Sequence, residues 1–352
     1  MKYILLLSMV SVVFSGSATV LTDDVDSYCC GLAVTDWGAI IHVNGEGELC
    51  ILNPDYSGGP IRMFLDWGTA LDGWGSLSRV GSLAGSPDGR FLCFTQVVAV
   101  PDEYYSDDAQ YIPYPEIVAV CRSDGTSLRV MGLSFDVGSG PHFAFTGDSR
   151  FVYGGPWLEC LPTPADFIEY FSGDGTGRLE PWLMMDVDTG ERSGDPSVIG
   201  DGFIENPYSD LVAAGWYPPN TIVDIRTQEV LLEDTSSSSP AIVEQWVLPD
   251  AGLARTDDGR QVLRYADGRE TVNPGPRVDV YCGLADGRYI FTEDGGESVM
   301  LGGIDWSDFS STWSVPLHSL DGLYPGSIMK EIPDGTGVVF VDGGSLKLAQ
   351  LP

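Results

Sequence analysis

One short turn recurs along this chain, and its recurrence limits the fold more than any other feature. The clearest copy is Ser86-Pro87-Asp88-Gly89-Arg90, which is followed by the apolar run 91–94. Proline presets the backbone for the second position of a tight turn, and glycine accepts the positive φ that closes it. A mixed polar and apolar segment precedes the turn at 78–84. The stretch therefore predicts a strand, a turn and a second strand.

Degenerate copies of the same pattern appear along the rest of the chain. Most keep an aspartate, together with the proline, the glycine or the arginine, and each leads into an apolar run. Their spacings range from 36 to 60 residues, around the roughly 40–50 residues of a β-propeller blade. With the clearest copy included, they begin at Val34, Ser86, Thr146, Asn206, Leu248, Leu284 and Ile332.

A second hairpin follows most copies, built from an apolar strand, a turn and another strand. Two hairpins per repeat make a four-stranded antiparallel sheet, which must stack on its neighbours to bury both faces. The sequence therefore predicts an all-β propeller of four-stranded antiparallel blades. The second hairpins lie at 49–64, 117–126, 183–191, 222–229 and 262–269.

The turn at 86–90 and the hairpin at 120–129 together resemble the TolB-like or WD-repeat-like propeller repeat of exported bacterial proteins. The resemblance implies a propeller fold and a binding role, and it brings no catalytic residues with it. Families with this repeat often have six blades. The repeats counted here favour seven, with six or eight as alternatives.

The last repeat holds three predicted strands, at 327–331, 338–341 and 346–351, before the chain ends. Residues 18–21 could supply the fourth, outer strand and so close the ring without an exposed edge. An unpaired N-terminal tail is the alternative.

Residues 1–17 have the character of an export signal. Met1-Lys2 gives a basic start, 3–14 is an apolar run of secretory length, and 15–17 offers small residues for cleavage. The run is too short for a bilayer span, and no later segment is apolar enough for one. We therefore expect a secreted or periplasmic protein with a signal peptide at 1–17 and a single propeller domain at 18–352.

The net charge of −33, from 18 Lys and Arg against 51 Asp and Glu, repels phosphate backbones and anionic lipid. Nucleic acid and acidic membranes are therefore poor partners. Export permits disulfides, but the odd number of cysteines leaves at least one without an intrachain partner. No pair or cluster has zinc spacing. The seven are Cys29, Cys30, Cys50, Cys93, Cys121, Cys160 and Cys282.

The predicted loops between second and third strands are expanded in two adjacent repeats, at 101–115 and 154–181, and both mix aromatic with acidic residues. The connection at 66–74 should open on the same face. Such loops could stack on sugars or hold cationic peptides; packing of the aromatics onto the propeller is the alternative. The candidate ligand-binding residues are Trp67, Trp74, Tyr104, Tyr105, Tyr111, Tyr114, Trp157 and Tyr170.

Catalytic motifs are absent from the sequence. There is no nucleophile elbow, phosphate loop or dinucleotide fingerprint, and we expect no cofactor. Segments 174–176 and 305–308 could hold Ca²⁺, but ordinary aspartate turns explain both better.

The sequence favours a non-catalytic binding or scaffolding module for a protein, peptide or glycan. One alternative is a propeller lyase or hydrolase acting on a glycan or lactone. Such an enzyme requires carboxylates and a histidine to converge at the mouth of the central channel. A structural partner in an envelope complex is the other alternative.

Overall fold

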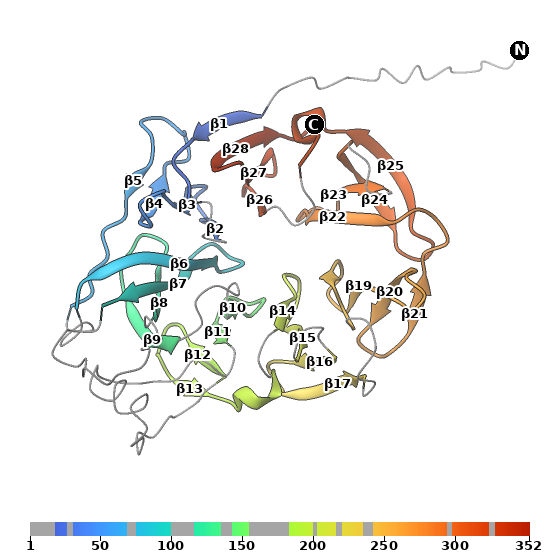
Figure 1. The fold of residues 1–352 in the computed structure, drawn as a ribbon, viewed down its shortest axis with the longest axis horizontal. Helices are drawn as coiled ribbons and strands as arrows, with labels where there is room; N and C mark the ends of the chain where they lie inside the picture. Colours follow the sequence, from blue (N-terminus) through green and yellow to red (C-terminus); the bar gives the residue numbers. More distant parts are fainter. Residues whose placement is uncertain are drawn as a thin grey trace, which may run out of the picture.

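The computed structural model describes eleven segments of the 352-residue chain. Their strands form seven four-stranded antiparallel sheets, arranged as blades around a central axis (Figure 1). This confirms the all-β propeller and fixes the number of blades at seven. The described segments are 18–26, 31–68, 75–99, 116–134, 143–154, 183–199, 203–215, 220–234, 242–293, 298–323 and 328–352.

The first strand of a blade lies nearest the axis and the fourth at the rim (Figure 1). Blade 1 is β2 (Leu32–Val34), β3 (Ile40–Val43), β4 (Leu49–Leu52) and β5 (Ile61–Arg62). Blade 2 is β6 (Leu77–Gly85), β7 (Phe91–Val98), β8 (Glu116–Arg122) and β9 (Arg129–Ser134). Blade 3 is β10 (Phe143–Phe145), β11 (Phe151–Gly154), β12 (Met184–Asp186) and β13 (Arg192–Ser193).

The remaining blades follow in chain order. Blade 4 is β14 (Phe203–Glu205), β15 (Leu211–Ala214), β16 (Thr221–Asp224) and β17 (Glu229–Glu233). Blade 5 is β18 (Gln245–Trp246), β19 (Ala251–Arg255), β20 (Gln261–Tyr265) and β21 (Glu270–Val272). Blade 6 is β22 (Val278–Gly283), β23 (Tyr289–Glu293), β24 (Met300–Asp305) and β25 (Ser310–Pro316). Blade 7 is β26 (Met329–Glu331), β27 (Gly337–Asp342), β28 (Ser345–Gln350) and β1 (Thr19–Thr22).

The N-terminal strand β1 closes the ring. It pairs antiparallel with β28, with Thr19 opposite Leu348 and Val20 opposite Lys347. Leu21 also packs against the apolar cluster shared by blades 7 and 1. The predicted closure of the ring by residues 18–21 is therefore confirmed.

Each blade buries both faces, because it lies between two neighbours. The apolar run 91–94, which follows the turn at 86–90, shows this directly. Phe91 packs into a cluster with blade 3, whereas Leu92 and Phe94 pack into a cluster with blade 1. Alternate side chains of a strand point to opposite faces, so a strand buried on both faces is apolar at nearly every position. Every interface between adjacent blades contains such a cluster.

Helix is scarce in the described segments. Two 3₁₀ turns are present, η2 (Pro196–Val198) and η3 (His318–Leu320). No helix in those segments has the length and apolar character needed to cross a membrane.

Four cysteines fall in the described segments, and all four are free thiols. Cys93 and Cys121 are buried in the clusters on the two faces of blade 2, where a thiol packs as a small apolar side chain. Cys50 is buried and Cys282 partly buried. The other three cysteines lie outside the described residues.

His42 is a buried polar side chain in β3. It is 0% exposed, it lies opposite Cys50 on β4, and neither ring nitrogen has a hydrogen-bond partner. Burial lowers the pKa of His42, although the charge and backbone of Asp24 act in the opposite direction. The imidazole is therefore neutral in the folded protein near pH 7.

Replacing His42 with leucine should stabilise the protein. We expect His42→Leu to raise the free energy of unfolding at pH 7 by about 1–3 kcal/mol, because it removes a buried polar group without a partner. The stability difference between His42→Leu and wild type should grow as the pH falls below about 6.5. Unfolded wild type then binds a proton at His42, whereas folded wild type does not, so the wild type loses stability. Urea unfolding of variant and wild type at pH 7.5, 6 and 5 measures this difference in the free energy of unfolding.

The control is His318→Gln, because His318 is exposed and its Nδ1 lies 2.9 Å from Asp321. A difference between His42→Leu and wild type that stays constant with pH would contradict this assignment.

Candidate functional site

In blade 2, a set of side-chain hydrogen bonds closes the recurring turn. The Ser86 hydroxyl donates to Asp88 at 2.7 Å and accepts from the Phe91 amide at 2.9 Å. The Asp88 carboxylate also accepts from the Arg90 amide at 3.1 Å. Gly89 takes the required positive φ of 72°. Thr146 and the residues after it repeat this arrangement in blade 3.

All seven predicted copies lie between the first and second strands of a blade. These turns therefore form a ring around the axis on one face of the propeller. At six of the seven blade interfaces, hydrogen bonds join one turn, or the strand beside it, to the next. They run from the Asp36 amide to Gly89 O (3.3 Å), the Asp88 amide to Ser149 Oγ (3.0 Å), the Gly147 amide to Asp210 Oδ1 (2.7 Å), Asn206 Nδ2 to Pro249 O (3.1 Å), the Tyr289 hydroxyl to Val247 O (3.1 Å) and the Ala285 amide to Glu331 Oε2 (2.7 Å).

Arg226 strengthens the contact between blades 3 and 4. Its guanidinium pairs with Asp148 of the blade 3 turn and, at 2.9 Å, with Asp210 of the blade 4 turn. It also lies over the Phe151 ring, 4.7 Å from the centroid. One side chain therefore joins two turns of the ring.

We expect Arg226→Gln to lower the free energy of unfolding by about 1–3 kcal/mol, because two half-buried carboxylates lose a charged partner. The matched control is Arg260→Gln. Among the described residues, Arg260 pairs with Asp258 of its own turn alone, and both side chains are 59% exposed. Arg260→Gln should therefore lower the free energy of unfolding by less than about 1 kcal/mol. Equal urea midpoints for the two variants would refute the role given to Arg226.

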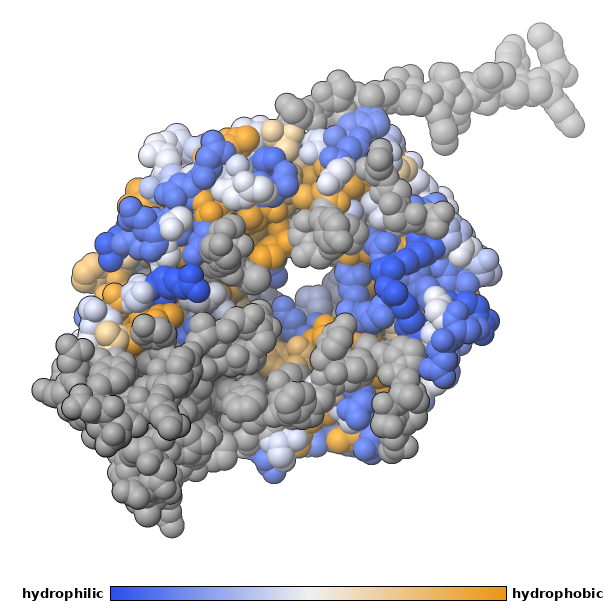
Figure 2. All heavy atoms as spheres, viewed as in Figure 1, coloured by the Kyte–Doolittle hydropathy of each residue, from blue (hydrophilic) through white to orange (hydrophobic). Residues whose placement is uncertain are grey.

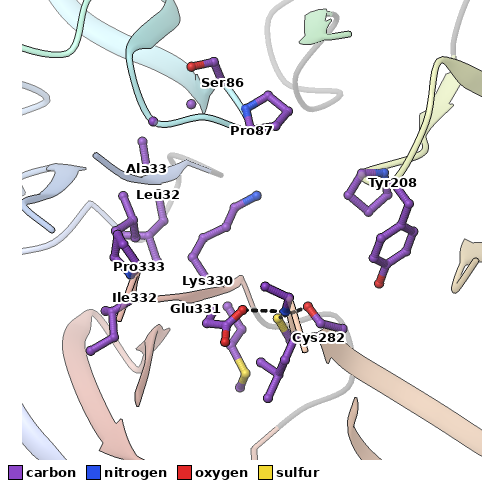
Figure 3. A pocket seen from close by; sticks show the side chains of 18 of the residues that line it. Leu32, Ala33, Ser86, Pro87, Tyr208, Cys282, Lys330, Glu331, Ile332 and Pro333 are labelled. Atoms are coloured by element: carbon purple, nitrogen blue, oxygen red, sulfur yellow. Dashed lines mark hydrogen bonds between the residues drawn. The ribbon is translucent and has the colours of Figure 1, made fainter. Parts of the chain in front are cut away.

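The ring of turns surrounds a cavity of about 1120 Å³ on the propeller axis. Every blade contributes to its lining, through first strands and the turns that follow them. Figure 2 shows the opening in the middle of the molecule, and Figure 3 shows the lining side chains from blades 1, 2, 4, 6 and 7. The fold thus brings residues from distant parts of the sequence into one site.

The lining is acidic, with seven carboxylate side chains against two cationic ones. Asp88 and Asp286 pair with the arginines of their own turns. Glu205 and Asp36 are exposed and form no ion pair with the described residues. The seven are Asp36, Asp88, Glu205, Glu244, Asp286, Glu331 and Asp334, and the two cations are Arg288 and Lys330.

Lys330, Tyr208 and Cys282 are lining side chains that can donate a hydrogen bond to a ligand. Lys330 of β26 extends into it, and Tyr208 of blade 4 points into it from the other side (Figure 3). Burial raises the pKa of Cys282 to about 11, with Lys330 acting in the opposite direction. Burial also raises the pKa of Tyr208. Both groups are therefore protonated at neutral pH.

Tyr208 spans the inner end of blade 5 and reaches Gly283 of blade 6. A Cβ added at Gly283 would lie 2.1 Å from the Tyr208 hydroxyl oxygen. The absence of a side chain at position 283 therefore sets the position of the tyrosine ring.

Imidazole does not line the described cavity. Of the histidines that the structure describes, His42 lies inside blade 1 and His318 lies on the surface in η3, and neither belongs to the lining. His142 lies outside the described residues. The lining offers carboxylates, an amine and a phenol, which suit binding of a charged ligand.

Of the aromatic residues predicted as ligand contacts, Trp67 is the one that the structure describes, and it does not line this cavity. Trp67 is half-buried, and its ring packs edge-on against Phe94 with the centroids 6.0 Å apart. The other seven lie outside the described residues: Trp74, Tyr104, Tyr105, Tyr111, Tyr114, Trp157 and Tyr170. The strands that border loops 101–115 and 154–181 meet these loops on the face opposite the ring of turns. Ligand binding by these aromatic residues stays a prediction.

The described segments contain no group of three or more histidine, cysteine, aspartate or glutamate residues placed to hold a metal ion. Segment 305–308, considered for Ca²⁺, is the turn between β24 and β25. Its Asp305 carboxylate accepts hydrogen bonds from the amide and the hydroxyl of Ser307 at 2.9 and 2.6 Å. Segment 174–176 lies outside the described residues.

No protein-family model matches the chain, and no curated protein matches its sequence. Among solved structures, it is similar to a chain of the mitotic checkpoint complex, with a TM-score of 0.49 and 13% identity over 96% of this chain and 94% of that one. It is also similar to the Myceliophteria thermophila Cps50 (Swd1) β-propeller domain, with a TM-score of 0.48 and 11% identity over 95% of this chain and 100% of that one. Similarities at this level assign no function, and the fold rests on the seven observed sheets.

Proposed function

We propose that this protein is a binding propeller that holds a basic peptide, or a basic segment of a partner protein, in its central cavity. The observation that carries the proposal is the lining of one cavity on the axis by seven carboxylates and only two cations. A concave site lined by one sign of charge concentrates the field and attracts ligands of the opposite sign.

The rest of the molecule supports the same ligand chemistry. The net charge of −33 attracts cations and repels polyanions at long range. Glu205 and Asp36 are exposed at the cavity without a cationic partner among the described residues, so a lysine or arginine of the ligand can pair with them. The resemblance of the 86–90 turn to TolB-like and WD-like repeats is in keeping with a binding role.

Fluorescence anisotropy with a labelled, arginine-containing octapeptide tests the proposal. We expect saturable binding that weakens strongly between 50 and about 300 mM salt, because exposed charge pairs are screened over a Debye length of roughly 8–10 Å. A peptide of the same length with glutamate in place of arginine, and a neutral oligosaccharide, should not bind.

The double variant Asp36→Asn, Glu205→Gln should weaken binding roughly tenfold, as expected for the loss of two exposed charge contacts of up to about 1 kcal/mol each. The matched control replaces Asp258 and Asp267, which pair with the arginines of their own turns away from the cavity. If the glutamate peptide bound as well as the arginine peptide, or if both double variants behaved alike, the central cavity would not be the site of a basic ligand.

We also propose that the protein is exported, with residues 1–17 removed as a signal peptide. The basic start, the short apolar run and the small residues after it support this. Mass spectrometry of the protein recovered outside the cytoplasm should give an N-terminus at Ala18. An intact N-terminus on protein found only in the cytoplasm would refute the proposal.

A further inference from the structure

Lys330 is an unusual residue for this chain. The sequence contains only three lysines. Lys2 lies in the proposed signal peptide, and Lys347 pairs with Asp342 at 2.6 Å. Lys330 lies on the innermost strand of blade 7, is exposed, and extends into the central cavity (Figure 3). Lys330 is the only lysine among the described lining residues, and its side chain extends into the space proposed for the ligand.

The acidic surroundings do not neutralise this ammonium group. The neighbouring Glu331 carboxylate accepts a hydrogen bond from the Ala285 amide at 2.7 Å, which holds it toward blade 6. Lys330 forms no ion pair or hydrogen bond with the residues that the structure describes. Three N–H donors and a full positive charge thus remain directed into the cavity.

The Tyr208 hydroxyl lies across the cavity from Lys330 (Figure 3). It is protonated at neutral pH, because burial raises its pKa, and it can therefore donate a hydrogen bond. An ammonium and a phenol in one cavity are the donors that a carboxylate needs. Charge-assisted hydrogen bonds of this kind are about twice as strong as neutral ones.

We propose that Lys330 receives the free α-carboxylate of the bound peptide, so that the cavity selects chains that end there and carry basic residues just before the end. This inference rests on the proposed function and names its ligand more closely. A chain end suits a site on the axis, since only one strand of peptide has to enter the ring. The carboxylate meets Lys330, and the preceding basic side chains meet the carboxylates of the lining.

Isothermal titration calorimetry with three peptides tests this. All three are N-acetylated and share one arginine-containing sequence. The first ends in a free carboxylate, the second in a carboxamide, and the third in a carboxamide after an added glutamate. We expect the wild type to bind the first roughly tenfold more tightly than the second, the equivalent of one hydrogen bond to a charged group. The third should bind no better than the second.

Two variants test whether Lys330 causes the preference for a free carboxylate. Lys330→Met should bind the first two peptides equally, whereas Lys347→Met should keep the tenfold preference. The Lys330 side chain is exposed, and the Lys347 side chain is partly buried beside Asp342. Cooperative urea unfolding of both variants confirms that they fold.

Equal binding of the first two peptides by the wild type, or a preference that survives Lys330→Met, overturns the inference but leaves the proposed function standing. Binding of the third peptide as tight as the first shows that the site accepts any carboxylate, which overturns selection for chain ends. If none of the peptides binds the wild type, the proposed function itself fails.

Discussion

Replacing Gly89 with alanine should unfold or severely destabilise the propeller. Gly89 has a positive φ of 72°, and a Cβ added there would lie 2.3 Å from the Asp36 amide nitrogen of blade 1. The nearest atoms to this Cβ belong to the backbone of Thr35 and Asp36, which cannot relieve the clash by rotating as a side chain could. We expect Gly89→Ala to lower the free energy of unfolding by about 3 kcal/mol or more, from the clash and the strained φ together.

Gly287→Ala is the matched control, because Gly287 occupies the same place in the blade 6 turn. Its φ is 84°, and a Cβ there would meet nothing within 4 Å. Gly287→Ala should therefore lower the free energy of unfolding only by the cost of a positive φ in alanine, about 1 kcal/mol. Thermal or urea unfolding of both variants measures the difference. Equal losses would show that the turns of blades 1 and 2 do not pack as described.

Removing the closing strand should have the second largest effect. A chain that begins after residue 26 loses β1, which leaves the edge of β28 unpaired. It also loses Leu21 and Val25 from the cluster between blades 7 and 1. Burial of one such side chain contributes about 1.5–3 kcal/mol, so we expect a loss of several kcal/mol and a tendency to associate through the open edge.

A chain that begins at Ala18 is the control and should unfold cooperatively as a monomer. Urea unfolding and light scattering of the two chains measure stability and association. If the shorter chain matched the control in both, ring closure by β1 would contribute nothing to the fold.

The sequence predicted the ring of turns well, because the chemistry of each turn is local. Even the weakest copy, at Val34, lies at the first hairpin of blade 1, where the Gly38 amide donates to Thr35 O at 3.0 Å. A proline, aspartate or glycine at a turn acts through its own backbone and its near neighbours. Ring closure was predictable for a related reason, since three strands at one terminus require a fourth.

The β24–β25 hairpin of blade 6 was not recognised from the sequence. Its turn holds Asp305 and Asp308, whose side chains accept local amide hydrogen bonds. The sequence indicated an ordinary aspartate turn there, with Ca²⁺ binding as the less favoured alternative, but not the two strands on either side of it. Strand β25 is exposed along its whole length, so it shows no alternation of buried and exposed residues. A strand without that pattern gives little signal.

The cavity could not be predicted from local patterns, because no single repeat contains it. Each turn alone is a polar surface loop, and only the closed ring brings seven of them to one axis. Lys330 is an example. It lies in an ordinary strand, Met329–Glu331, and only the closed ring places its side chain in the central cavity. The rarity of lysine in so acidic a chain was the one signal in the sequence that could have singled it out.

Hydrogen–deuterium exchange with and without a basic peptide tests most directly whether the central cavity is the binding site. The account predicts slower exchange of the backbone amides that line it, above all at 204–208, 280–288 and 329–335, with little change in loops 101–115 and 154–181. Protection confined to those two loops, with the cavity segments unchanged, would contradict it and place ligand binding on the opposite face.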